Sequence, residues 1–201
     1  MVIYMEILIA TSNLHKIMEI KNIFKDYNIK IISLLDVGFK DEIIENGQTF
    51  KENAYIKAKT IYDIYHMNVI ADDSGLEVIA LDLKPGVYSH RYSASGLDKD
   101  NNELLLKNMK GITNRKAHFK TSLCFISKDK TIYTEGILEG EILEAPRGEN
   151  GFGYDPLMYI EEYHKTVAEM TMEEKNNISH RSKAFNNMIK ELLKNEIISR
   201  I

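Results

Sequence analysis

The sequence predicts an α/β protein built on a mixed β-sheet, and two features of the chain carry this prediction. The first is an opening in which an apolar strand, a turn and a helix follow one another. The second is the segment 117–142, where apolar residues alternate with polar ones and β-branched residues are frequent, as in antiparallel strands. The class is therefore α/β with a mixed sheet, in which parallel and antiparallel strands occur together.

Length and composition favour one continuous globular unit. The chain has 201 residues, 44 % of them apolar, which is enough to bury a core without disulfide or metal staples. Cys124 is the single cysteine and no Cys/His pair has zinc-ligand spacing, which excludes a secreted disulfide scaffold and a zinc module and favours a reducing cytoplasm. A net charge of −4 argues against nucleic acid polymers as partners, and no run is long enough to span a membrane.

The first third of the chain predicts a strand and two helices. Residues 3–10 form an apolar strand, and Glu6 with the absence of a basic flank distinguishes this strand from a signal peptide. A turn and cap at residues 11–13 precede a helix with apolar residues at helical spacing: Ile17, Ile20 and Phe24. Thr49 and Glu52 form a capping box for a second helix. Its apolar stripe consists of Phe50, Ala54, Ala58, Ile61 and Tyr65.

The second half of the chain predicts a helix, antiparallel strands and a closing helix. Residues 98–109 are typical of a helix that stops at Gly111. The strands within 117–142 are joined by a turn at residues 128–129. A helix over residues 179–198 ends the chain, with four apolar residues facing inward: Phe185, Ile189, Leu192 and Leu193.

Two adjacent acids, Asp72 and Asp73, follow an apolar run in NVIADDSGLEV, residues 68–78. We expect the strand to end at these acids, because a Ser-Gly turn comes directly after them. One interpretation is a solvated turn, since Asp bonds its own backbone and Gly accepts positive φ. The other is a strand end that aims both carboxylates at a metal ion or a water. The second interpretation makes the acids candidate metal ligands.

Two lysines occupy positions that suit an anion. Lys16 lies in TSNLHK, residues 11–16, where a helix N-terminus attracts negative charge; an ordinary helix cap with a solvated lysine is the alternative. A helical wheel puts Lys57 beside Phe50, in the stripe that should face the core, with Asn53 one turn before it on the same flank. Lys57 therefore either extends past its neighbours to water or reaches a cleft lined by an anion.

Two further segments suit a base or another ligand. The loop RGENGFGYDP, residues 147–156, places Phe152 between glycines as a stacking surface, unless it is a bulged turn. Ser179 is expected to cap the last helix, with His180 and Arg181 in its first turn. Basic residues oppose the helix dipole there, which indicates an anionic or carbonyl-rich neighbour, or else a solvated face.

Six motifs in this order resemble those of the inosine triphosphate pyrophosphatases, also called XTP/dITP diphosphatases: TSNLHK, FKENAYIKA, ADDSGLEV, PGVYSHRY, GFGYDP and EEKNNISHR. The resemblance covers almost the whole chain. It implies a single domain, residues 1–201, in which an elongated mixed sheet with flanking helices forms two lobes around a nucleotide cleft. It also implies a cytoplasmic homodimer that uses Mg²⁺ to hydrolyse ITP, dITP and XTP between the α and β phosphates.

The resemblance assigns roles to individual residues. Glu45 and Asp73 would hold Mg²⁺ with Asp72 nearby, and Asp73 would also accept a proton. The residues that would contact the substrate are Thr11, Ser12, Asn13, Leu14, His15, Lys16, Lys57, Ser74, Phe152, Gly153, Tyr154, Asp155, Lys175, His180 and Arg181. Departures from the family pattern stand beside the motifs: LDLKPG lacks the common glycines before Pro85, and two single residues differ, with His90 in place of the usual alanine and Met158 in place of a frequent aromatic residue.

Two other functions are compatible with these motifs. A related nucleotide pyrophosphatase would act on a different base, such as a modified pyrimidine or a methylated nucleotide. A non-catalytic nucleotide-binding protein would use the same lysines but would have little need of Glu45 and Asp73 together. A purely structural role would leave Lys57 and the paired acids unexplained.

Overall fold

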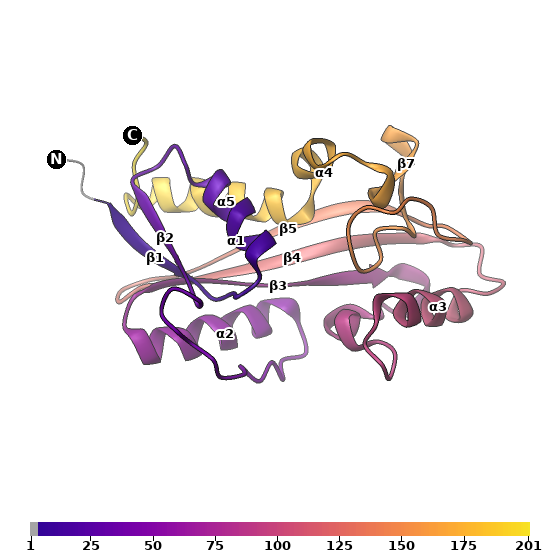
Figure 1. Ribbon diagram of the computed structural model, residues 1–201, viewed down its shortest axis with the longest axis horizontal. Coiled ribbons are helices and arrows are strands. Elements are labelled where there is room, and N and C mark those ends of the chain that lie inside the picture. The colour runs from indigo at the N-terminus through magenta and orange to yellow at the C-terminus, as the bar shows by residue number, and fades with distance from the viewer. Residues whose placement is uncertain (1–3) are drawn as a thin grey trace. The chain divides into compact units, whose positions relative to one another are not determined.

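The computed structural model describes residues 4–201, except for the side chain of His15. In these residues the chain forms one seven-stranded sheet of order β2-β1-β3-β4-β5-β6-β7, with helices beside it (Figure 1). β1 pairs in parallel with β2 and β3, whereas β6 pairs antiparallel with β5 and β7. The mixed α/β sheet predicted from the sequence is therefore confirmed.

The elements follow one another in the order β1 (Met5–Ile9), α1 (Leu14–Ile23), β2 (Ile29–Ser33), α2 (Phe50–Tyr65), β3 (Asn68–Val78), η1 (Ile79–Leu81), η2 (Gly86–Arg91), α3 (Asp98–Asn108), β4 (Lys116–Ile126), β5 (Thr131–Ile142), β6 (Met158–Ile160), η3 (Glu161–Tyr163), β7 (Lys165–Thr166), η4 (Val167–Glu169), α4 (Met172–Ile178) and α5 (His180–Lys194). The η elements are 3-10 helices. Among the described helices, none is long and apolar enough to cross a membrane.

The chain divides into two compact units. The first comprises the residues up to Asp73 together with Thr121–Gly136 and Ser182–Ile201, and the second comprises Ser74–Lys120 and Ile137–Arg181. Strands β3, β4 and β5 each contribute residues to both units. Each unit has its own hydrophobic core.

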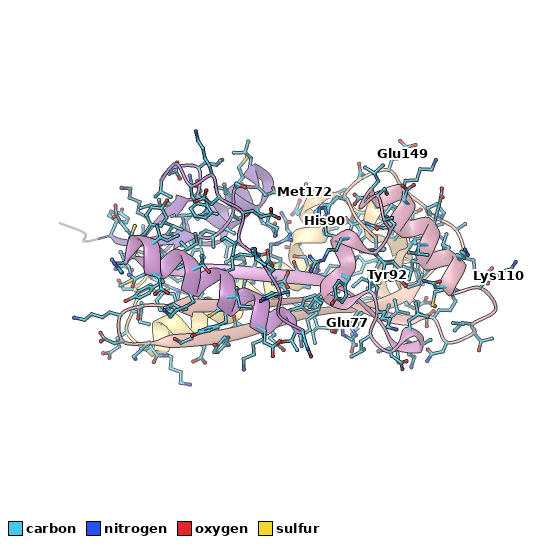
Figure 2. The ribbon with its side chains drawn as sticks, turned by 90° about the horizontal axis from the view of Figure 1, so that it is seen from below. Glu77, His90, Tyr92, Lys110, Glu149 and Met172 are labelled. Carbon is cyan, nitrogen blue, oxygen red and sulfur yellow. The ribbon has the colours of Figure 1, made fainter. Side chains whose placement is uncertain are left out.

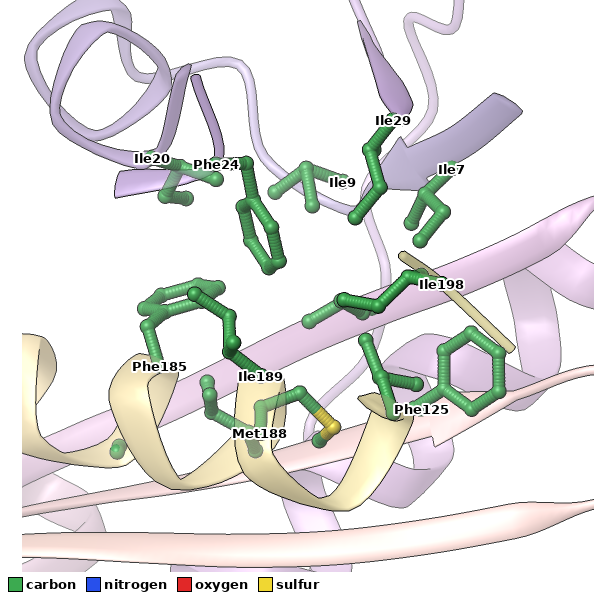
Figure 3. Packing of buried hydrophobic residues seen from close by; sticks show 14 residues of the cluster. Ile7, Ile9, Ile20, Phe24, Ile29, Phe125, Phe185, Met188, Ile189 and Ile198 are labelled. Carbon is green, nitrogen blue, oxygen red and sulfur yellow. The ribbon is translucent and has the colours of Figure 1, made fainter. Parts of the chain in front are cut away.

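The first unit buries apolar residues on both faces of its strands. Successive side chains of a strand point to opposite faces, so Ile7 and Leu8 of β1 enter different clusters. Ile7 belongs to the same buried cluster as Phe24 and as Phe185 of α5 (Figure 3). The Phe24 and Phe185 rings meet edge to face, with centroids 6.0 Å apart. Leu8 belongs to the cluster that contains Ala54 of α2.

The capping box of α2 is confirmed. The Thr49 hydroxyl accepts the Glu52 backbone N–H at 3.1 Å, and the Glu52 carboxylate accepts the Thr49 N–H at 3.2 Å. The stripe that follows is buried at Phe50, Ala54, Ala58 and Ile61. The start of α2 is thus fixed by local sequence, and this start sets which side chains of α2 face the strands.

The second unit packs α3 and β6 against its part of β3. Leu105 and Met109 join Leu76 of β3 and Met158 of β6 in one buried cluster. Met158 is fully buried, so the departure at this position places a flexible apolar side chain in the core. The other departure, His90, lies exposed on η2 (Figure 2). Neither departure removes a polar partner from the candidate site.

The prediction that the strand ends at the acids is wrong. Asp72 and Asp73 lie inside β3, which continues to Val78. Gly75 serves packing and not a turn, because a Cβ there would lie 2.4 Å from the Ser89 hydroxyl oxygen. The short strands β2, β6 and β7 and the helix α4 were not predicted from the sequence.

Candidate functional site

The turn between β1 and α1 places Lys16 against Asp72. Asn13 caps α1, because its Oδ1 accepts the Lys16 backbone N–H at 3.2 Å, while the Asn13 N–H donates to Thr11 Oγ1 at 3.2 Å. Lys16 Nζ lies 2.7 Å from Asp72 Oδ2, and the Asp72 side chain is only 3 % exposed. The helix cap is therefore real, but the lysine is held in a partly buried ion pair and is not simply solvated.

Lys57 extends from α2 into the same group of charges. Its Nζ lies 3.0 Å from Glu45 Oε1 and donates to the backbone carbonyl of Asp72 at 2.9 Å. Burial lowers the pKa of Lys57, but the negative charges of Asp72, Glu45 and Asp73 raise it above its ordinary value overall. Lys57 therefore stays charged and contacts carboxylates, instead of extending to water.

The pKa of Asp73 is raised well above its ordinary value. Burial raises its pKa to about 6, and the charges of Glu45 and Asp72 add to this rise. A hydrogen bond from Asn53 and the positive charge of Lys57 oppose it. The Asn53 Nδ2 donates to Asp73 Oδ2 at 2.9 Å. Asp73 is thus half-protonated near pH 6, as suits an acid–base residue.

The chemistry of these side chains fits Mg²⁺. Glu45, Asp72 and Asp73 offer the hard carboxylate oxygens that this ion prefers, and nucleotide sites usually hold it with one or two carboxylates plus phosphate oxygens and water. Within the described part of the chain, no three His, Cys, Asp or Glu side chains form a ready-made metal site. The electrostatic effect of Glu45 and Asp72 on Asp73 shows that the acids act on one another, so a cation among them would relieve their repulsion.

A second cluster lies in the loop after β5, in the second unit. The Phe152 ring is 60 % exposed, and Lys175 Nζ lies 4.8 Å from its centroid. Asp155 fixes this arrangement, because its Oδ2 accepts the Phe152 N–H at 3.0 Å and the Lys175 ammonium at 2.5 Å. Gly151 and Gly153 have positive φ values of 82° and 62°, which a side chain would rarely adopt. The loop therefore presents an aromatic face beside a cation.

Two residues that the sequence did not indicate tie this loop to α3. Asp98 accepts the Gly153 N–H at 2.7 Å, and Asn102 donates to the Gly153 carbonyl at 3.0 Å. Tyr154 is buried in the core of the unit, and its hydroxyl donates to the Ser89 carbonyl at 2.8 Å. No local sequence pattern predicts such contacts, since the partners are 51 to 65 residues apart in the chain.

The first turn of α5 is packed and not solvated. Ser179 directly precedes the first residue of α5, as expected. The His180 ring stacks on Phe119, with centroids 5.1 Å apart and an interplanar angle of 27°. Arg181 is 6 % exposed, so the interpretation of a solvated face is wrong. A buried guanidinium in this turn is a strong hydrogen-bond donor.

The structure brings together part of the predicted set. Lys16, Lys57, Glu45, Asp72 and Asp73 form one cluster in the first unit, whereas the Phe152 loop and Lys175 form another in the second. Ser12 and Leu14 are exposed beside the first cluster, Ser74 follows Asp73 in β3, and the His15 side chain lies outside the described structure. Burial raises the pKa of Cys124 to about 12, so this thiol is not a nucleophile.

A model of the Ham1 family matches residues 7–191. The chain belongs to the Ham1 family. This Ham1-family chain is 48 % identical over 200 residues to the dITP/XTP pyrophosphatase of Thermoanaerobacter pseudethanolicus, covering 98 % of each chain. The Staphylococcus aureus Ham1 protein has a similar structure, with a TM-score of 0.88, 39 % identity and coverage of 95 % of this chain and 99 % of that one.

A Coxiella burnetii HAM1 protein also has a similar structure, with a TM-score of 0.89, 35 % identity and coverage of 94 % of this Ham1-family chain and 99 % of that chain. The Thermoanaerobacter relative is named dITP/XTP pyrophosphatase, which is the family that the sequence motifs resemble. The resemblance drawn from TSNLHK, ADDSGLEV and the other motifs is therefore confirmed at the level of the family.

Proposed function

We propose that this protein hydrolyses non-standard purine nucleoside triphosphates, ITP, dITP and XTP, to the monophosphate and pyrophosphate, with Mg²⁺ as cofactor. The observation that carries the proposal is the cluster in which Lys16 and Lys57 meet Glu45, Asp72 and Asp73. Full-length relatives named dITP/XTP pyrophosphatase support the choice of substrate. Removal of such nucleotides from the pool is the corresponding role.

Each side chain of the cluster has a distinct task in this reaction. Lys16 and Lys57 neutralise phosphate oxygens, because a triphosphate otherwise repels the incoming water. Asp73 accepts a proton from that water as its oxygen bonds to the α-phosphorus and the bond to the bridging oxygen breaks. Pyrophosphate leaves with the electron pair of that bond. Glu45 and Asp73 would hold Mg²⁺, with Asp72 nearby, and the ion would supply positive charge to the phosphate oxygens.

The second-unit cluster suits the base. Phe152 offers an exposed ring for stacking, and Lys175 and Arg181 are donors that match a carbonyl-bearing purine. Asp155 and Tyr154 would act mainly by shaping the loop, since both side chains are buried. We also propose a homodimer in the cytoplasm, which the family resemblance and the single buried cysteine support.

The test is pyrophosphate release from a panel of nucleoside triphosphates at saturating Mg²⁺. We expect turnover of ITP, dITP and XTP, with no orthophosphate released directly, and loss of turnover when the metal is chelated. The Asp73→Asn variant serves as the control, because it preserves shape but removes the proton acceptor.

Two results would point to the alternative functions. Preferential turnover of a modified pyrimidine or methylated nucleotide would identify a related pyrophosphatase with another base preference. Tight nucleotide binding without any pyrophosphate release would identify a binding protein, and Asp73→Asn would then bind as the wild type does.

A further inference from the structure

Asn53 joins the two segments that carry the candidate metal ligands. It lies in the first turns of α2 and is 1 % exposed. Its Nδ2 donates to Asp73 Oδ2 at 2.9 Å, and its Oδ1 accepts the Gly47 backbone N–H at 2.8 Å. A carboxamide has a donor at one end and an acceptor at the other, so one side chain links the loop of Glu45 to the strand of Asp73.

The fit around the Asn53 amide is close. A Cβ on Gly47 would lie 2.7 Å from Asn53 Oδ1 and 2.7 Å from Glu52 Cβ. Real Cβ atoms do not approach so closely, so any other residue at position 47 would displace the loop or the amide. The loop therefore packs closely against α2 at Gly47, two residues after Glu45.

A second asparagine, Asn101, makes one of the two kinds of hydrogen bond that Asn53 makes and not the other. Asn101 is the fourth residue of α3, as Asn53 is of α2, and it is also buried. Its Oδ1 accepts the Ser93 backbone N–H at 2.7 Å, and its Nδ2 donates to the His90 carbonyl at 3.3 Å. Both asparagines thus fix a preceding loop to a helix. Only Asn53 directs its amide donor at a carboxylate, which a loop clamp does not require.

We propose that Asn53 is a positioning residue for the metal site: it sets the orientation of the Asp73 carboxylate and its separation from the loop that carries Glu45. This inference rests on the proposed function, because it takes Asp73 and Glu45 as the ligands of the ion. Lys57 lies one helical turn further along α2 and bonds Glu45 and the Asp72 carbonyl. Helix α2 therefore holds both ligand segments through two side chains on one flank.

The size of the effect follows from the behaviour of residues that orient metal ligands. Their replacement typically lowers metal affinity or activity by about 10–100-fold. We expect Asn53→Ala to raise the half-saturating Mg²⁺ concentration by about this factor and to lower kcat. The KM for ITP at saturating metal should change much less, since the Asn53 amide bonds Asp73 and Gly47 and not the ammonium groups that would bind phosphate.

The experiment compares Asn53→Ala with Asn101→Ala as its matched control. Both changes remove a buried amide from the fourth position of a helix and should lower the Tm. Metal binding is measured without nucleotide, from the EPR signal of free Mn²⁺ as it is titrated with protein, and kcat and KM are measured against Mg²⁺ with ITP. Gly47→Ala disturbs the same clamp from the loop side and keeps Asn53 in place.

The positioning role predicts weaker Mn²⁺ binding for Asn53→Ala and Gly47→Ala and unchanged Mn²⁺ binding for Asn101→Ala. Equal Mn²⁺ affinity in all four proteins would overturn it and leave Asn53 as a loop clamp. If Asn53→Ala does not fold, the Gly47→Ala result alone decides. The Mn²⁺ measurement does not need turnover, so a wild-type protein that binds Mn²⁺ but releases no pyrophosphate would contradict the proposed function and not the role of Asn53.

Discussion

Lys57 Nζ lies between Glu45 Oε1, at 3.0 Å, and the backbone carbonyl of Asp72, at 2.9 Å. The ammonium thus occupies a place among the acids that a divalent cation and phosphate oxygens would share with it. In the proposed reaction, a bound metal–nucleotide complex would replace part of the Lys57–Glu45 attraction by attraction to phosphate. Lys57 would then stabilise both the resting site and the substrate complex.

Replacement of Lys57 should lower activity strongly. Lys57→Met removes a fixed positive charge from the phosphate site, and loss of one such group typically costs about 10²–10³-fold in rate. Lys59→Met is the control on the same helix, because Lys59 is exposed and pairs with Asp63 of α2. Steady-state kinetics with ITP measure both. Equal activity of the two variants would show that Lys57 does not contribute to the phosphate site.

A Mg²⁺ titration should separate the roles of Asp73 and Glu45. Asp73→Asn removes the proton acceptor, so kcat should fall about 10²–10⁴-fold and stay low at any metal concentration. Glu45→Gln should weaken metal binding, so part of its activity should return as Mg²⁺ is raised. If excess Mg²⁺ restores both variants equally, Asp73 is only a ligand and another group accepts the proton.

The metal-free protein should become more stable when Asp73 is replaced by asparagine. The folded-state pKa of about 6 exceeds the unfolded value of 3.8, chiefly because Asp73 is buried. The folded protein therefore binds more protons than the unfolded chain between these values, and stability falls as pH rises through this window. Above about pH 6 the ionised Asp73 lowers the free energy of unfolding by at most about 3 kcal/mol. The asparagine variant does not carry this cost.

Thermal unfolding at several pH values checks this prediction. The Tm advantage of Asp73→Asn in EDTA should be near zero at pH 4, grow up to about pH 6 and stay constant above it. Added Mg²⁺ should reduce the advantage, because the ion binds the folded wild type. An advantage that does not change with pH would show that the carboxyl group is not perturbed by burial.

Phe152→Ala should act on substrate affinity and not on folding. The ring is 60 % exposed, and stacking of one base is worth about 1–3 kcal/mol, which corresponds to roughly a 5–150-fold rise in KM. Tyr159→Ala is the matched control, because Tyr159 also lies beneath a cation, Arg147, in the same unit. Circular dichroism and kinetics measure both variants. A loss of folded signal for Phe152→Ala would mean that the loop is a structural turn.

Base selectivity should favour a 6-oxo purine over adenine. In the proposed complex, the buried guanidinium of Arg181 and neighbouring backbone N–H groups would donate to the 6-oxo oxygen, whereas the 6-amino group of ATP would present another donor. One unpaired buried donor costs about 1–3 kcal/mol, so two give about 10³-fold discrimination in kcat/KM. Comparable kcat/KM values for ATP and ITP would contradict this assignment. Arg181→Gln should lower the ratio of kcat/KM for ITP to kcat/KM for ATP.

Much of the fold could be predicted because its signals are local. The capping box at Thr49 and Glu52, the apolar stripe of α2 and the alternation in β4 each depend on residues close together in the chain. The short strands β2, β6 and β7 could not be predicted, because strands of two to five residues are defined by their pairing and carry little pattern of their own. The extension of β3 past the acids was not predicted either, because Gly75 looked like a turn residue and its close approach to Ser89 is visible only in the folded chain.

The family and the candidate chemical groups could be recognised from the sequence, since they depend on ordered motifs and residue types. The contacts between these groups required the folded structure: Lys57 with Glu45, Asn53 with Asp73, and Asp98 with the Phe152 loop. The partners are separated by 12, 20 and 55 residues in the chain, and no local sequence pattern fixes such contacts. The physical reason is that burial and neighbouring charge, which raise the pKa of Asp73, arise only when distant segments pack together.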